Sequence, residues 1–301
     1  MRSSTVLAAL AAVACGVPAG SLAFAATRAE PVRITIHTDQ GDVRAELFSA
    51  LAPETVRLFL ARAKGAPAVS DPAVGAAAVG DPAVAAYAGT QVCETRGSVH
   101  VVFGCQPFEN SGPKPHAAKL GPQAPDEIDG RAMGLGAQIL NDMKTVHALW
   151  QLEVFPRYTQ LSDSGKVVPA RLAHMFDEFL HKGSDAEDML LGKTKLFYLE
   201  AMGFTYHDGL SPLRVTKGSL ATFTMWPGDA DERFLVALDD LTERDGRATV
   251  FGRVVEGWDV LDRIQRIPTD KARRPETPVR ITGVSIDDDA GGASPAPTGE
   301  R

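Results

Sequence analysis

Strand-like sequence lies at both ends of the chain and encloses a long helical stretch. Residues 32–38 alternate apolar and polar side chains, and the turn residues 39–42 lead into a second strand-like stretch at 43–48. This pattern predicts an antiparallel hairpin. Further short strands are predicted at 218–225, 233–238, 248–255 and 279–286. Because the strands precede and follow the helices rather than alternating with them, we expect one β-rich domain with a helical insert, not a parallel α/β sheet.

Two short helices are predicted within the β-rich part. Pro53 at a first helical position, Glu54 in the first turn and an apolar stripe behind them predict a helix over 53–64. A second helix is predicted at 256–264, directly after a strand. Each is short enough to cover part of a sheet without forming a layer of its own.

The insert at residues 137–204 has helical periodicity throughout. Two stretches place apolar residues at helical spacing, and we expect both faces to be buried as core. The first consists of Ile139, Met143, Val146, Trp150 and Val154, and the second of Leu172, Met175, Phe176, Phe179 and Leu180. A third helix is expected to begin at Ser184 as its N-cap and to stop at Gly203.

The composition is that of a folded protein and excludes several classes of function. Apolar residues make up 44% of the chain and charged residues 23%, which is ordinary for a globular protein. The net charge of −7 disfavours a nucleic-acid partner held by phosphate neutralisation. The seven histidines are scattered singly, and neither a paired-cysteine motif nor a glycine-rich phosphate loop is present. We therefore expect no metal and no cofactor.

The first 25 residues resemble a secretory leader. Arg2 supplies a positive start, residues 6–14 are an unbroken apolar run, and Ala23-Phe24-Ala25 fits a small-x-small cleavage site. Nine apolar residues are far fewer than the roughly 20 that a spanning helix needs. The prediction is an exported protein, periplasmic or extracellular, without a stable transmembrane segment. A lipid anchor at Cys15 is the weaker alternative, because Ala12 stands where a larger aliphatic residue is usual.

Only Cys93 and Cys105 remain after such a leader. Two short strands joined near residues 97–98 would bring the two cysteines opposite each other, so a cross-strand disulfide is one interpretation. Two separate buried thiols are the other, since a one-residue slip in register turns one sulfur to the opposite face. Residues 65–87 are read as a low-complexity loop and 287–301 as a disordered tail.

The sequence also resembles a known family. Residues 249–264, TVFGRVVEGWDVLDRI, are similar to a signature of the cyclophilin-type peptidyl-prolyl cis-trans isomerases. Residues 32–60 resemble the opening of that family, and Asp245-Gly246-Arg247 resembles its "LDGKH" turn. Residues 125–128 and 132–135 are similar to a stretch of bacterial, insert-bearing cyclophilins. The resemblance implies a closed, mainly antiparallel β-barrel of about eight strands capped by two helices, formed by 32–136 and 205–286.

The same resemblance implies where the family's proline site would lie. In the family one hairpin supplies a catalytic arginine, a phenylalanine and a glutamine. Laid without gaps on residues 87–107, that hairpin places Thr95 at the arginine, His100 at the phenylalanine and Phe103 at the glutamine. Arg96 lies one position from the arginine and is a candidate catalytic residue. Its other interpretation is a solvated arginine beside a hairpin turn.

The second half of the family's site also differs here. The alignment places Arg233 at a glutamine, Leu235 at the pocket phenylalanine, Glu243 at a tryptophan and Ala248 at a histidine. Arg233 is a second catalytic candidate, or else the partner of a nearby carboxylate. His100, Phe103, Leu235 and Ala248 are the candidates for a proline pocket.

Two functions remain open on these residues. One is a cyclophilin-type isomerase homologue that acts on or binds proline-containing polypeptides, with activity weakened because the family's Arg, Phe, Gln, Trp and His are replaced. The alternative is a non-catalytic binding module, a pseudoenzyme that uses the former groove or binds a protein partner at the helical insert. The sequence does not decide whether the protein is an enzyme.

Overall fold

The computed structural model describes residues 30–64, 87–107, 124–224, 226–228 and 230–287. The predicted leader with Cys15, the low-complexity loop up to residue 86 and the tail beyond residue 287 lie outside these residues.

Eight antiparallel strands form one sheet, in the order β3-β4-β6-β5-β7-β2-β1-β8. The strands are β1 (Val32–Thr38), β2 (Gly41–Leu47), β3 (Gln91–Thr95), β4 (His100–Cys105), β5 (Ser219–Thr222), β6 (Phe234–Ala237), β7 (Val250–Glu256) and β8 (Ile281–Ile286). The two ends of the sheet meet, because the Val92 N–H donates to the Val279 carbonyl at 2.9 Å and the Ile281 N–H to the Thr90 carbonyl at 2.8 Å. The closed antiparallel barrel expected from the sequence is therefore confirmed.

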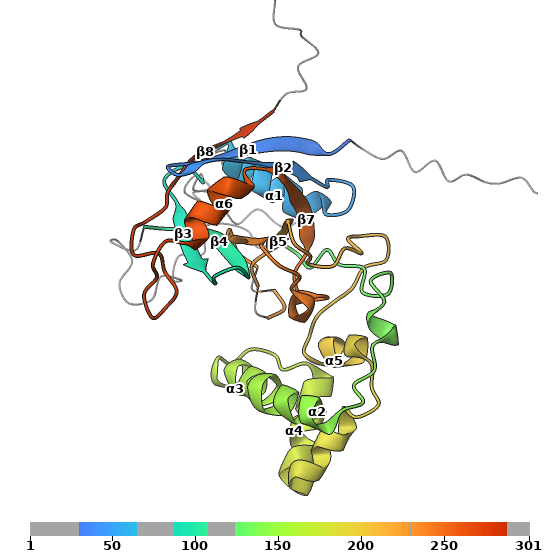
Figure 1. Ribbon diagram of the computed structural model, residues 1–301. Helices are drawn as coiled ribbons and strands as arrows, with labels where there is room; N and C mark the ends of the chain where they lie inside the picture. Colours follow the sequence, from blue (N-terminus) through green and yellow to red (C-terminus); the bar gives the residue numbers. More distant parts are fainter. Residues whose placement is uncertain (1–29, 65–86, 108–123, 225, 229, 288–301) are drawn as a thin grey trace, which may run out of the picture.

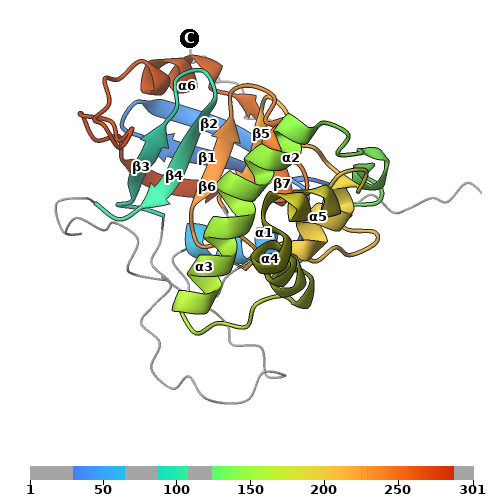
Figure 2. The ribbon, with the colours of Figure 1, turned by 90° about the horizontal axis from the view of Figure 1, so that it is seen from below.

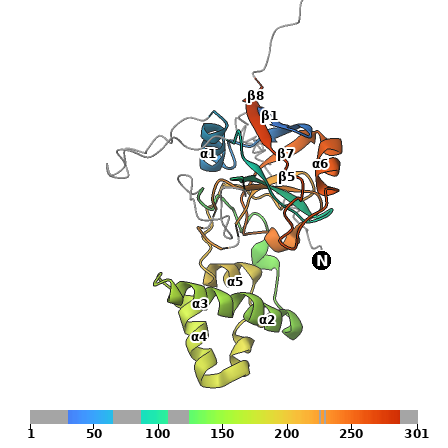
Figure 3. The same cartoon turned by 90° about the vertical axis from the view of Figure 1, so that its left-hand side faces the viewer.

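Two helices cover the barrel at opposite sides (Figure 3). Helix α1 (Pro53–Ala63) contributes Val56 and Phe59 to the barrel core, and α6 (Trp258–Gln265) contributes Leu261 and Ile264. Strand side chains alternate between this core and the exterior, as the pleat of a β-strand requires. The barrel interior is thus filled by side chains and is not a channel.

The insert forms a separate helical body below the barrel (Figure 1). Its helices are α2 (Met143–Leu149), α3 (Phe155–Asp163), α4 (Ala170–Lys182) and α5 (Lys195–Ala201), with a π-helical turn at Trp150–Val154 and 3-10 turns at Leu135–Ala137 and Gly183–Met189. They pack around their own core, which includes Trp150, Leu172 and Tyr198. Among the described residues, none of the helices has the length and apolar character needed to span a bilayer.

Two details of the expected helices are wrong. Ser184 caps no long helix, because Gly192 adopts φ +74° and interrupts the segment. The helix begins instead after Thr194, whose Oγ1 accepts a hydrogen bond from the Phe197 N–H at 3.0 Å. Ile139, Met143 and Leu180 are also not core residues, with 49%, 42% and 69% of their surface exposed. The first helix starts only after its N-cap, Asp142, so the buried apolar stripe of this helix begins at Val146.

The start of α1 is capped by a residue distant in sequence. Ala52 occupies the N-cap position and has no side chain that can accept a hydrogen bond. The buried Glu127 carboxylate fills this role by accepting from the Glu54 N–H at 2.9 Å and the Thr55 N–H at 2.8 Å. A carboxylate at a helix N-terminus satisfies otherwise unpaired donors and is favoured by the helix dipole. Glu127 therefore joins the segment before the insert to the barrel's helix.

We predict that Glu127→Ala lowers the free energy of unfolding by about 1–3 kcal/mol, because two buried N–H groups lose their acceptor. Urea denaturation followed by circular dichroism measures this change. Glu276→Ala, at an exposed carboxylate, is the matched control and should shift stability by less than about 0.5 kcal/mol. Equal effects of the two substitutions would contradict the capping role.

Candidate functional site

The candidate site lies on the exterior of strands β3, β4, β6 and β5, called here the outer face. Phe234 points into the barrel core, so its neighbour Leu235 points outward. A compact apolar cluster surrounds Leu235. This outer-face cluster consists of Cys93, Val102, Cys105, Val215, Ala221, Leu235, Ala237, Leu241, Ala248 and Val250.

The cluster is covered rather than open. Leu235 has 0% and Ala248 1% of its surface exposed, although both lie outside the barrel core. Phe223, Val99 and Leu213 pack against the cluster and are themselves partly buried. The structure thus brings two of the sequence's pocket candidates together, as a buried apolar floor.

Phe103 does not join them, which corrects the sequence-based assignment. It pairs with Phe234 across β4 and β6, and the two rings stack inside the barrel with centroids 5.3 Å apart. The reason is a bulge at Gly104, which has φ +98° and where a Cβ would lie 3.0 Å from the Glu232 carbonyl oxygen. The extra residue shifts the count by one, so Val102 takes the outward position.

Three polar side chains that bond one another, Glu94, His100 and Arg273, lie at the β3 side of the outer face. Glu94 stands opposite Val102, and its Oε1 lies 3.3 Å from His100 Nε2 and 3.1 Å from Arg273 Nη1. The hydrogen bond with His100, followed by the one with Arg273, lowers the pKa of Glu94 from its ordinary value of 4.5. His100 is buried. It is therefore held by a carboxylate at the edge of the site and does not form an apolar wall.

The arginine proposed from the first hairpin lies in the turn between two strands of the outer face. Arg96 is exposed in the turn between β3 and β4, where its N–H donates to the His100 carbonyl at 3.0 Å. Thr95, at the position of the family's arginine, pairs with Val101 and is buried. Val101 belongs to the barrel core. Thr95 therefore points toward the barrel core and not toward the outer face.

Two other arginines stack on Phe223 at the edge of the outer face. The Arg233 guanidinium lies 4.9 Å from the ring centroid, and its Nε and Nη2 donate to Asp231 at 2.6–2.9 Å. This is the carboxylate pairing that the sequence offered as the alternative for Arg233. Arg244 lies 5.4 Å from the same centroid, and its Nη1 donates to the Thr224 carbonyl at 2.7 Å.

Arg244 was missed by sequence reasoning. It occupies the leucine position of the "LDGKH"-like turn, where the family pattern gives no reason to expect a cation. Burial lowers its pKa from the ordinary value. Among the described residues the Arg244 side chain forms no ion pair, and the hydrogen bond that it donates is to a carbonyl. It is the half-buried guanidinium of this site that is not paired with a carboxylate.

Cys93 and Cys105 form a disulfide, with their Cα atoms 5.3 Å apart. Cys93 is the bulged residue of β3, between Val92 and Glu94 in the ladder with β4. Both cysteines belong to the outer-face cluster. The bond therefore fixes the two strands that form one side of the site.

A row of Ser, His and Asp side chains lies elsewhere on the barrel surface. His37 Nδ1 is 2.9 Å from Asp42 Oδ1, and His37 Nε2 is 3.0 Å from Ser285 Oγ. Ser285, His37 and Asp42 are thus connected in the same order as the nucleophile, base and carboxylate of a catalytic triad. In such triads, however, the carboxylate is buried. The Asp42 side chain is 56% exposed. We interpret the row as a cross-strand hydrogen-bond ladder.

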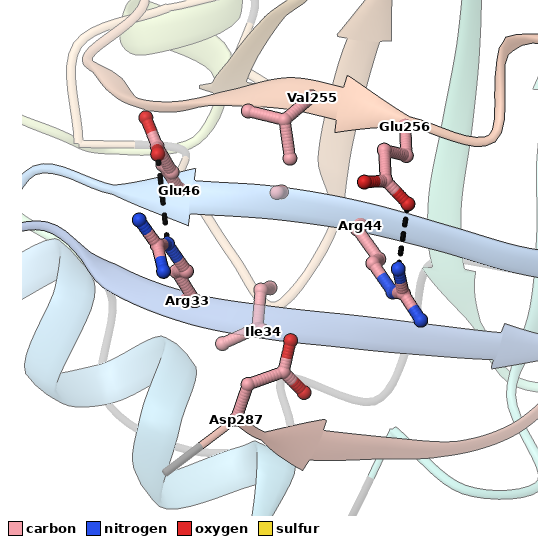
Figure 4. A pocket seen from close by; sticks show the side chains of 8 residues that line it. Arg33, Ile34, Arg44, Glu46, Val255, Glu256 and Asp287 are labelled. Atoms are coloured by element: carbon pink, nitrogen blue, oxygen red, sulfur yellow. Dashed lines mark hydrogen bonds and ion pairs between the residues drawn. The ribbon is translucent and has the colours of Figure 1, made fainter. Parts of the chain in front are cut away.

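Two cavities lie outside the outer face, and their charged groups are paired. One, of about 360 Å³, lies over β1, β2 and β7 (Figure 4), where Arg44 bonds Glu256 at 2.6 Å and Arg33 lies 3.8 Å from Glu46. The other, of about 830 Å³, lies between the insert and the segment 204–208. Within the described part of the chain no three His, Cys, Asp or Glu side chains are placed to hold a metal ion.

Comparisons with known proteins agree with this architecture. The family described as "Cyclophilin type peptidyl-prolyl cis-trans isomerase/CLD" matches residues 33–286. Peptidyl-prolyl cis-trans isomerase-like 1 of Neurospora crassa is 29% identical over 129 residues, covering 43% of this chain and 77% of the relative. Peptidyl-prolyl cis-trans isomerase-like 4 of the same fungus is 38% identical over 102 residues, covering 32% of this chain and only 20% of the relative.

A solved structure also resembles the chain. It is the crystal structure of a cyclophilin-type peptidyl-prolyl cis-trans isomerase of Cryptosporidium parvum, at 13% identity and a TM-score of 0.43. The match covers 86% of this chain and 99% of that protein. On the family match over residues 33–286, the chain belongs to the cyclophilin-type peptidyl-prolyl cis-trans isomerase family.

We predict that Glu94 contributes stability that is present above its ordinary pKa of 4.5 and is lost as the pH falls through its lowered pKa. The difference in unfolding free energy between the native chain and Glu94→Gln should therefore shrink on acidification. Urea denaturation at several values between about pH 3 and pH 7 measures it. A difference that stays constant over that range would contradict the assigned contacts.

Proposed function

We propose that this chain is a weak peptidyl-prolyl isomerase that binds proline-containing segments over the outer face. The observation that supports this most is Arg244, a half-buried guanidinium without an ion pair among the described residues, which stacks on Phe223 beside an apolar floor. The family and its printed relatives supply the reaction class.

The proposed chemistry needs no covalent step. Rotation about an X-Pro bond is slow because amide resonance must be broken. As the bond twists, the prolyl nitrogen regains its lone pair and becomes a hydrogen-bond acceptor. A fixed N–H donor then stabilises the twisted state more than the planar one. Arg244 would supply that donor, and Phe223 would hold the guanidinium plane.

Weak rather than efficient catalysis follows from the floor of the site. Leu235 and Ala248 are covered in the described structure, so a proline ring must first displace side chains that pack against the cluster, such as Val99 and Leu213. Glu243, at the position of the family's tryptophan, is exposed and adds no apolar wall. Both features reduce the binding energy available to the twisted state.

Binding without catalysis is the second candidate. The family's arginine position holds Thr95, which is buried opposite the core residue Val101. If Arg244 cannot reach a prolyl nitrogen, the outer face would bind proline segments as an adaptor surface. The two candidates differ in whether a rate above the uncatalysed one is measured.

We further propose that the protein is exported. The leader-like residues 1–25 predict this, and the Cys93–Cys105 disulfide is a bond that persists in oxidising compartments and is rare in reducing ones.

We predict that the native chain speeds isomerisation of an Ala-Ala-Pro-Phe peptide above the buffer rate, and that Arg244→Leu returns it to that rate. Loss of one placed donor typically lowers the rate by about 10²–10³. A weak catalyst slowed by this factor would be indistinguishable from buffer. A protease-coupled assay measures both. Arg266→Leu, at an exposed arginine, is the matched control.

Each outcome of that assay separates the candidates. If Arg96→Ala rather than Arg244→Leu removes the rate, the guanidinium comes from the hairpin turn instead. If the native chain matches buffer but binds the peptide, the adaptor function is correct. If it neither isomerises nor binds the peptide, both candidates fail.

A further inference from the structure

The turn at residues 241–248 is one wall of the candidate site. Its two ends, Leu241 and Ala248, are members of the outer-face cluster beside Leu235. Arg244 lies between these two residues in sequence, and its guanidinium lies over the Phe223 ring. The position of this turn therefore decides whether a guanidinium and an apolar floor lie next to each other.

The insert and the connection leaving it hold this turn by three hydrogen bonds. Lys195 Nζ on α5 donates to the Thr242 carbonyl at 2.9 Å, and the Tyr206 hydroxyl donates to the Gly246 carbonyl at 2.8 Å. Arg247 Nη2 donates to Glu153 Oε2 at 2.6 Å. These bonds reach the turn from the side of the insert, which lies below the barrel in Figure 1 and in front of it in Figure 2.

The ion pair of Glu153 and Arg247 is the strongest of these contacts. The two side chains are only 25% and 11% exposed. The Tyr198 hydroxyl also donates to Glu153 Oε2, at 2.6 Å. Although burial alone would lower the pKa of Arg247, Glu153 and Tyr198 outweigh it and raise that pKa. Removal of one charge of such a pair leaves the other buried without compensation, which is strongly destabilising locally.

Close packing reinforces the hydrogen bonds at Gly246. This glycine has φ +82°, and a Cβ there would lie 2.5 Å from Leu135 Cδ1 and 2.9 Å from Leu199 Cδ1. No larger residue fits without moving the turn or the insert. Leu135 and Leu199 belong to the insert's own core, so the turn rests on a well-packed body.

The connection between β5 and β6 also packs against the insert. Trp226, in the connection between β5 and β6, packs against the insert's core, and the Arg157 guanidinium of α3 lies 5.3 Å from its ring centroid. The hydrogen bond from Arg244 to the Thr224 carbonyl, 2.7 Å long, links this connection to the turn. The insert thus contacts both segments that flank Phe223.

We propose that the helical insert is a working part of the peptide site: through Glu153 and Lys195 it positions the turn at 241–248 so that Arg244 faces the apolar floor. Glu153 and Lys195 are positioning residues in this account, since they touch the turn and not the peptide. The inference rests on the proposed function for its peptide readout, but the position of the turn can be measured without a peptide.

The test combines hydrogen–deuterium exchange of the turn with peptide affinity in the full chain. Glu153→Gln keeps the shape of the side chain and removes its charge. Lys195→Met keeps the aliphatic stem and removes the donor, and it is the second variant in case Glu153→Gln folds poorly. We expect amide exchange across 241–248 to rise about tenfold, which corresponds to roughly 1.4 kcal/mol of lost local stability. Affinity for an Ala-Ala-Pro-Phe peptide should fall by a similar factor.

Glu200→Gln is the matched control. It breaks the ion pair of Glu200 with Arg171, 2.8 Å long and internal to the insert, and neither residue bonds the turn. It should leave both exchange across 241–248 and peptide affinity unchanged.

The outcomes separate this proposal from the proposed function. If neither Glu153→Gln nor Lys195→Met changes exchange in the turn, or if exchange rises while affinity stays constant, the positioning role is overturned. If the native chain binds no peptide, the proposed function fails, and the exchange data alone decide whether the insert holds the turn.

Discussion

The aromatic packing around Phe234 determines the rest of the site. Its ring stacks on Phe103 and meets Phe59 and Tyr87 edge-on, with centroids 5.3–5.4 Å apart. A side chain held this firmly inside the barrel fixes the register of β6, and neighbours in a strand point to opposite faces. Leu235 must then face outward. The apolar floor of the site is thus a consequence of core packing in the barrel.

The family scaffold sets the floor of the site, and charged side chains surround that floor. Barrel closure, the two covering helices and the outward Leu235 are retained. Around that floor charged groups lie on two sides. Glu94 is paired with His100 and Arg273 on one side, and Arg244 stacks on Phe223 on the other. A guanidinium and an apolar surface are therefore neighbours on the outer face.

Sequence patterns predicted the fold well because strand alternation and the motif at 249–264 are local signals. They also placed Leu235 correctly in the outward position, since the spacing from Pro227 to Arg233 is that of the family. They misplaced Phe103 because the bulge at Gly104 reverses the face of the β4 residues that precede it. Arg244 could not be found this way, because its contact with Phe223 depends on the packing of two distant turns.

We propose that proline-containing peptides bind over the outer face, beside Phe223 and the turn held by the insert. Chemical-shift mapping of the ¹⁵N-labelled protein during titration with Ala-Ala-Pro-Phe tests it directly. Binding there should produce the largest changes at Phe223, Leu235 and Arg244. Changes confined to the opposite side of the barrel around Arg44 and Glu256, or no change at saturating peptide, would contradict it.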